Sequence, residues 1–272
     1  MTAMRMFRTR YDLVFGLGFA CSCSESLRAA GLQLLSFPYD WIAPTIGPDA
    51  DYGHELRDRI REIGDDFSQW LQPDELVFVH ASEATGKDIY ASRRLKHTFN
   101  HDFPLGAPYD EMFPVVREKY HRRAERLLGL IRSARRVLVV RVDRPDLPVP
   151  TDVADCQDAV RALGGRFAPT RFDFLQVSFE AGRKEVREEA FGGNVTRWTL
   201  DYQDHRPGAG SWQVDIPLLG GLLRKRFAVR DYRTRAERRA FAAERRKKRY
   251  AKLGARNFLE YQILRLFRRR KG

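Results

Sequence analysis

The chain has 272 residues, 43% of them hydrophobic, and a formal net charge of +13. This length and apolar content suffice for a sizeable core, which excludes an intrinsically disordered protein. Three cysteines do not make a disulfide framework, and residues 1–10 lack the apolar run of a secretory signal, so we expect a cytoplasmic protein in a reducing compartment.

Apolar runs alternate with segments of helical periodicity along most of the chain. The patterns predict strands at residues 11–17, 75–80, 136–142, 173–179 and 195–200, and helices at 22–30, 52–63, 110–133 and 151–163. Successive apolar positions, as in the strand at 136–142, are typical of strands covered on both faces. The sequence therefore predicts, for residues 1–221, an α/β domain with a mostly parallel sheet and flanking helices, in flavodoxin- or esterase-like layering.

The positive charge is concentrated in residues 222–272, which hold 20 Lys and Arg against 4 Asp and Glu. Residues 234–252 favour a highly charged helix, and residues 255–271 place apolar side chains at helical spacing among arginines. This basic amphipathic helical tail is typical of a helix that lies on an anionic membrane surface. Nucleic acid is the less favoured partner, and an intramolecular or partner-protein contact is the third alternative.

One turn, residues 18–25, carries most of the functional information. Gly18 permits a sharp exit from the first predicted strand, and Ser22 and Glu25 have the spacing of a capping box at a helix start. Cys21 would then lie where free amide groups and the helix dipole favour a thiolate. The alternative is a small apolar residue packed under the strand, because free cysteine is commonly buried.

The other cysteines indicate no metal site. Cys23 lies two residues after Cys21, but no second pair of Cys or His follows at ligand spacing. Cys156 falls in a helical pattern and is expected to pack in the core. We therefore expect neither a metal ion nor a cofactor.

Several motifs together resemble a known bacterial family. They are the Gly-x-x-Cys-Ser turn with Leu27-Arg28, the stretch Ser36-Phe37-Pro38-Tyr39-Asp40-Trp41, and Phe99-Asn100-His101-Asp102-Phe103-Pro104. Over roughly residues 11–143 the chain resembles a family of domains of unknown function described as papain-like cysteine peptidases. Other members tend to have phenylalanine in place of Tyr39. The alternating α/β pattern, with the cysteine after the first strand, differs from the papain fold that the family description implies.

The resemblance implies that Cys21 is a nucleophile and His101 its base. A neighbouring imidazole would take the thiol proton, and a third polar residue would orient the ring. Asp143, just past the predicted strand at 136–142, is the candidate orienter, with Asp102 as the alternative. In an esterase-like layout a late histidine would serve as the base, which makes His205 the alternative to His101.

The expected substrate-binding residues fall into two groups. Gly18, Ser22, Asp40 and Trp41 surround the turn in sequence or follow the proline of the second motif, although Trp41 could instead close the core. Arg122 and Arg123 lie on one flank of a predicted helix and suit an anionic sugar phosphate or nucleotide, with a solvated helix face as the alternative.

These residues predict a cysteine peptidase or hydrolase that uses a Cys-His pair. The alternatives are an acyl- or glycosyl-type transferase in bacterial surface-polysaccharide biosynthesis, acting on an activated acyl or sugar substrate, and a non-catalytic binding module. The basic tail predicts peripheral association with the inner face of the membrane.

Overall fold

The computed structural model describes residues 8–19, 21–44, 52–146 and 150–244, without the side chains of 52–54. The chain divides into two units, residues 1–231 and 232–272. The first unit holds two larger sheets and a two-stranded parallel ribbon formed by β1 (Thr9–Tyr11) and β11 (Phe227–Val229).

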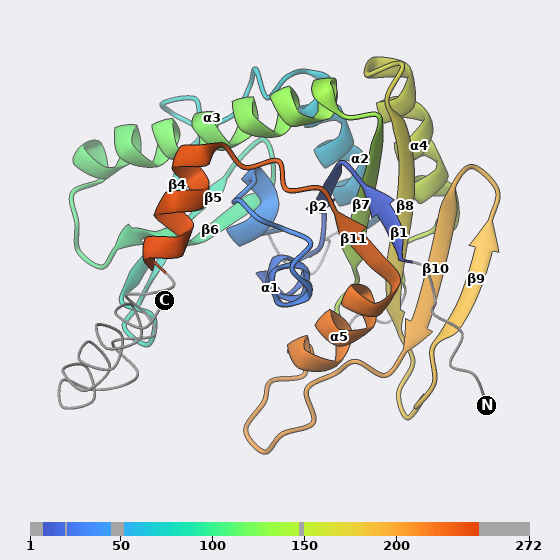
Figure 1. Ribbon diagram of the computed structural model, residues 1–272. Coiled ribbons are helices and arrows are strands. Elements are labelled where there is room, and N and C mark those ends of the chain that lie inside the picture. The colour runs from blue at the N-terminus through green and yellow to red at the C-terminus, as the bar shows by residue number, and fades with distance from the viewer. Residues whose placement is uncertain (1–7, 20, 45–51, 147–149, 245–272) are drawn as a thin grey trace, which may run out of the picture. The chain divides into compact units, whose positions relative to one another are not determined.

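The larger of the two sheets has five strands (Figure 1). Their spatial order is β2 (Leu13–Gly16), β7 (Arg136–Val142), β8 (Arg171–Phe179), β10 (Val195–Leu200) and β9 (Arg187–Phe191). The first four strands are parallel to one another, whereas β9 runs antiparallel to β10. The four parallel strands end at a common edge, where α/β proteins bind their ligands.

Helices cover both faces of this sheet. On one face, α1 (Cys21–Ala30) and α5 (Ile216–Arg226) bury Leu27 and Leu219 against Val140 and Val177. On the other face, α2 (Tyr52–Gly64) and α4 (Val153–Arg166) contact the sheet through Glu55 and Cys156, which face Arg141 on β7 and Gln176 on β8. The sheet is therefore the middle layer of three.

The second sheet has four strands, all antiparallel. Its order is β3 (Ile42–Pro44), β6 (His97–Pro104), β5 (Lys87–Ser92) and β4 (Leu76–Ser82). The long helix α3 (Tyr109–Ser133) packs on it through Tyr120, whose ring centroid lies 5.3 Å from that of Phe99. A short 3-10 helix, η1 (Pro38–Trp41), precedes β3.

The prediction of a mostly parallel sheet in flavodoxin- or esterase-like layering is wrong. The second sheet is antiparallel, and β9 makes the first sheet mixed. Residues 75–80 were expected in the parallel sheet, but they form most of β4, where Phe78 is 55% exposed. Apolar runs report burial and extended backbone, while strand direction follows from connections, here the short turns around Gly86 and Lys96 with positive φ.

The predicted helices and their observed counterparts agree closely, with differences at the ends. α4 continues to Arg166, three residues beyond its predicted end at residue 163. The predicted boundary after residue 221 falls within α5, and β11 follows in the same unit. No helix in the described ranges is long and apolar enough to cross a membrane.

The described part of the second unit contains one helix, residues 235–244. Thr234 and Glu237 form a capping box at its start: the Glu237 amide donates to Thr234 Oγ1 at 3.2 Å, and the Thr234 amide donates to Glu237 Oε2 at 2.8 Å. The apolar cluster predicted at 255–271 lies outside the described residues.

Candidate functional site

The turn between β2 and α1 is built around a close approach of Gly18 to Cys23. A Cβ atom on Gly18 would lie 2.3 Å from the Cβ of Cys23, so glycine is required there for α1 to approach the sheet. Cys23 is buried and its thiol donates to the Val140 carbonyl at 3.5 Å. Burial raises the pKa of Cys23 to about 12. Cys23 is therefore a packing residue beneath the turn.

Cys21 is the first residue of α1 and is half-buried. Burial and the Glu25 carboxylate raise the pKa of its thiol, and the backbone amides of Cys21 and Ser22 only partly oppose this rise. The thiol is therefore protonated at neutral pH, in contrast to the thiolate expected from the helix dipole alone. Ser22, the predicted cap, lies inside the helix as its second residue and is buried.

Two buried arginine side chains donate hydrogen bonds to backbone carbonyls of the turn. Arg59 on α2 donates through Nη1 to the Gly18 carbonyl at 2.6 Å, and Arg141 on β7 donates through Nη1 to the Leu17 carbonyl at 2.9 Å. Glu55 bridges the two guanidinium groups, with its Oε2 atom 2.7 Å from Arg141 Nη1 and its Oε1 atom paired with Arg59 Nε. Because both arginine side chains are fully buried, the turn is fixed by charged hydrogen bonds screened from solvent. Sequence patterns missed all three residues.

Asp143 belongs to the same buried layer. Its carboxylate accepts from Thr151 Oγ1 at 2.6 Å and from Gln176 Nε2 at 2.8 Å, and it lies 3.4 Å from Arg141 Nε. These partners occupy both carboxylate oxygens, and none is a histidine. Asp143 therefore orders the carboxyl edge of β7 and β8.

His101 lies on β6 with an exposed side chain. Its ring centroid is 6.0 Å from that of Trp41, and the Arg28 guanidinium of α1 lies 5.6 Å from the Trp41 ring centroid. A chain of ring contacts thus joins His101 to α1. Among the described residues no hydrogen bond links His101 to the Cys21 thiol.

Asp102 is adjacent to His101 but faces the opposite way, because successive strand residues alternate between faces. It is buried, accepts from Tyr120 Oη at 2.8 Å and pairs with Lys119. His205, the alternative base, is exposed, and its Nε2 atom lies 2.9 Å from Asp201 Oδ1. The structure brings neither residue to the turn by a direct contact within its described part.

Asp40 is fully buried and joins η1 to α1. Its carboxylate accepts from Ser24 Oγ at 3.0 Å, from the Phe37 amide at 2.9 Å, from Arg28 Nη2 at 3.1 Å and from Gln33 Nε2 at 2.5 Å. Burial raises the pKa of Asp40 although these donors oppose the rise. Asp40 thus fastens the Trp41 segment to the helix that starts at Cys21.

Arg122 and Arg123 lie on α3. Arg122 pairs with Glu118 one turn away, at 3.5 Å, and both side chains are largely exposed. The Arg123 guanidinium lies 5.2 Å from the centroid of the Tyr120 ring. Arg122 therefore lies on the exposed surface of the helix, and Arg123 lies against the buried Tyr120 side chain.

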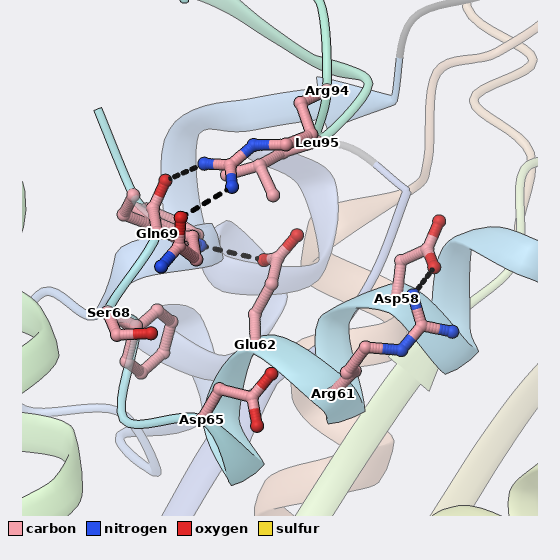
Figure 2. A pocket seen from close by; sticks show the side chains of 10 residues that line it. Asp58, Arg61, Glu62, Asp65, Ser68, Gln69, Arg94 and Leu95 are labelled. Carbon is pink, nitrogen blue, oxygen red and sulfur yellow. Dashed lines mark hydrogen bonds and ion pairs between the residues drawn. The ribbon is translucent and has the colours of Figure 1, made fainter. Parts of the chain in front are cut away.

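A cavity of about 190 Å³ lies beside α2, where no sequence motif pointed (Figure 2). Figure 2 shows Arg94 bound to Gln69 at one end of the cavity, the Arg61–Asp58 ion pair at the other, and Glu62 between them. The cavity is separate in sequence from the residues of the turn.

Glu62 at this cavity is held by three donors. Tyr39 Oη and Trp70 Nε1 each donate to Oε2 at 2.9 Å, and His97 Nε2 lies 2.9 Å from both oxygens. The carboxylate thus connects α2 to η1 and β6. Only its position between Ile60 and Ile63 could have indicated that it is buried.

The described residues contain no group of three or more His, Cys, Asp and Glu side chains that could hold a metal ion. No family model, curated protein or solved structure matches the chain. The fold defines an α/β protein with one mixed and one antiparallel sheet, and the family resemblance of its motifs remains a prediction.

Proposed function

We propose that this protein is a thiol-dependent hydrolase in which Cys21 is the nucleophile and His101 the base. One observation carries the proposal: Cys21 begins a ten-residue helix directly beyond the carboxyl edge of the parallel strands, at a turn that buried arginines hold in place. Nucleophiles in α/β proteins occupy such edges because the backbone there is rigid and the side chain is open to ligand.

The chemistry would proceed from a neutral thiol. Because the pKa of Cys21 is raised, the base removes the proton as the sulfur attacks a carbonyl carbon, and a thioester forms when the leaving group takes that proton. Free backbone amides at the start of α1 would stabilise the oxyanion. Water then attacks the thioester and releases the acid product together with the free thiol.

His101 would reach the thiol through a rearrangement of its exposed side chain, because its ring contact with Trp41 leads to Arg28, about two turns along α1 from Cys21. In this proposal Asp143 shapes the edge through Thr151 and Gln176 instead of orienting the imidazole. If an acceptor other than water attacks the thioester, the same residues perform an acyl transfer.

A non-catalytic binding module is the second candidate. The raised pKa of Cys21 and the lack of a direct hydrogen bond to His101 among the described residues favour it, because both lower the reactivity of the resting thiol.

We also propose that the protein acts in the cytoplasm at the inner face of the membrane, recruited by the basic segment 222–272. The excess of Lys and Arg in that segment supports attraction to anionic lipid. Co-sedimentation with vesicles containing phosphatidylserine tests this. Failure of the full chain to bind these vesicles, or equally strong binding to vesicles of phosphatidylcholine alone, would contradict it.

The hydrolase proposal is tested by acylation. Incubation with p-nitrophenyl acetate should place one acetyl group on Cys21, detected by peptide mass spectrometry, and His101→Gln should slow this about 100-fold or more, the usual contribution of a general base. Cys156→Ser, which alters a buried thiol elsewhere, is the control. If both acetylation and release of p-nitrophenolate are absent, or if both are equally fast in His101→Gln, the Cys-His pair is eliminated and the binding module is left.

A further inference from the structure

The buried arginines beneath the turn retain unused hydrogen-bond donors. The Nη2 atoms of Arg59 and Arg141 are inaccessible to solvent, and neither has an acceptor among the described residues. Leaving a charged donor unpaired in the interior costs more than leaving a neutral one unpaired. Two such groups at one turn therefore call for a functional explanation.

The two Nη2 atoms lie close to the turn because each shares a planar guanidinium with an Nη1 atom already bound there. Arg59 Nη1 donates to the Gly18 carbonyl, and Arg141 Nη1 donates to the carbonyl of the preceding residue, Leu17. The guanidinium groups that carry the two unpaired donors are thus hydrogen-bonded to neighbouring carbonyls, three and four residues before Cys21.

The acidic side chains of the cluster are already engaged. Glu55 is shared between both arginines, and the Asp143 oxygens accept from Thr151 and Gln176. The aromatic ring of Phe19 lies against the Arg141 guanidinium, with 4.2 Å between Cζ and the ring centroid, and Tyr39 lies similarly against Arg59 at 5.0 Å. Rings and carbonyls hold each guanidinium in place, while its buried Nη2 atom has no acceptor among the described residues.

An acceptor for both groups would have to be an anion with several oxygens. Guanidinium groups bind carboxylate and phosphate through parallel N–H donors, and the amides that open α1 on the same turn also favour negative charge. The location is the carboxyl edge of β2 and β7, where a ligand of the proposed reaction would lie.

We propose that the Nη2 groups of Arg59 and Arg141 form an anion subsite at the β2–α1 turn, and that the substrate of Cys21 carries a carboxylate or phosphate group. The assignment of this anion to the substrate rests on the proposed function, whereas anion binding itself does not.

The test uses the full chain with sodium phosphate and sodium acetate as separate probes, at constant ionic strength set by sodium chloride. Thermal unfolding and the rate of Cys21 alkylation by iodoacetamide are both measured. A bound anion should raise the unfolding midpoint and slow alkylation, and both effects should saturate. A response to phosphate alone assigns a phosphorylated substrate, and a response to acetate alone assigns a carboxylate.

Arg59→Lys and Arg141→Lys keep the positive charge but remove the Nη2 group. Each should lower the affinity for the anion about ten-fold or more, because one charge-assisted hydrogen bond is lost. Arg61→Lys, on the same helix but exposed, should bind like the wild type. Unsaturable effects in the wild type, or unchanged affinity in both lysine variants, would overturn the subsite. If neither lysine variant folds, trimethyl phosphate decides: this neutral ester should have no effect, and protection equal to that by phosphate would overturn the subsite.

Failure of the two proposals can be told apart with Cys21→Ser. This variant should retain saturable anion binding by thermal unfolding while acetylation is lost. If the wild type binds the anion but is not acetylated, the proposal that Cys21 is a nucleophile is contradicted and the anion subsite is supported. If Cys21 is acetylated but the anion changes neither the unfolding midpoint nor the alkylation rate, the anion subsite is contradicted and the nucleophile is supported.

Discussion

The β2–α1 turn and strand β6 carry the two members of the proposed pair, and they are held in opposite ways. At the turn, fully buried arginines bind the carbonyls of Leu17 and Gly18, and Cys21 follows half-buried. On β6 the His101 side chain is exposed and its ring contacts Trp41. The backbone before Cys21 is thus fixed by buried hydrogen bonds, whereas the exposed His101 side chain can change rotamer.

This difference separates stability from reactivity. Buried charged groups that satisfy backbone carbonyls are costly to remove, because their partners are left unpaired. An exposed imidazole on a strand contributes little to folding. Substitutions at the turn should therefore affect the free energy of unfolding, and substitutions at His101 should affect chemistry alone.

The largest effect is expected from Arg141→Met. It removes the buried cation that the Leu17 carbonyl, Glu55 and Asp143 share, so the free energy of unfolding should fall by about 3–5 kcal/mol. Urea unfolding followed by tryptophan fluorescence measures it. Arg61→Met, at an exposed site on α2, is the control and should change stability by less than about 0.5 kcal/mol. A similar loss in both variants would show that the buried clamp does not support the fold.

Gly18→Ala should give a smaller loss. The added Cβ would lie 2.3 Å from Cys23 Cβ and 3.0 Å from its Sγ atom, and such overpacking typically costs about 1–3 kcal/mol. Gly129→Ala, in the middle of α3 with no heavy atom within 4 Å, should instead stabilise by about 0.5–1 kcal/mol. If calorimetry shows equal shifts for the two alanines, the close approach of α1 to the turn is not required.

The smallest effect on stability is expected from His101→Gln. Because the side chain is exposed, the free energy of unfolding should stay within about 0.5 kcal/mol of the wild type, even as Cys21 acetylation slows. A loss of more than about 1 kcal/mol in urea unfolding would mean that His101 is a structural residue, and the contrast between turn and strand would fail.

The residues of the candidate site differ in how far sequence could locate them. Cys21 follows a buried strand and opens a helix, so a local pattern suffices to place it. Asp143 was expected to orient an imidazole because it follows β7, yet its carboxylate is engaged by Thr151 and Gln176. The sequence predicted that Asp143 follows the end of a strand, but it could not predict which side chains its carboxylate binds.

Arg59 and Arg141 show the same limit more strongly. Arg141 is a charged residue within an apolar strand, whereas Arg59 lies in a highly charged helix. Glu55, which bridges them, is 86 positions from Arg141 in the chain. Charged side chains normally lie at the surface, so sequence gives no reason to bury them. Only the meeting of β2, β7 and α2 supplies the carbonyls and the carboxylate that make their burial possible.

Sequence alone determined the positions of the main helices, five of the strands and the start of α1 near Cys21, because periodicity and apolar runs are local properties. It also determined that the positive charge is concentrated in residues 222–272. The tertiary structure decided strand direction, the second sheet, and the buried arginine clamp. Those features depend on connections and on contacts between segments far apart in the chain, which no local pattern encodes.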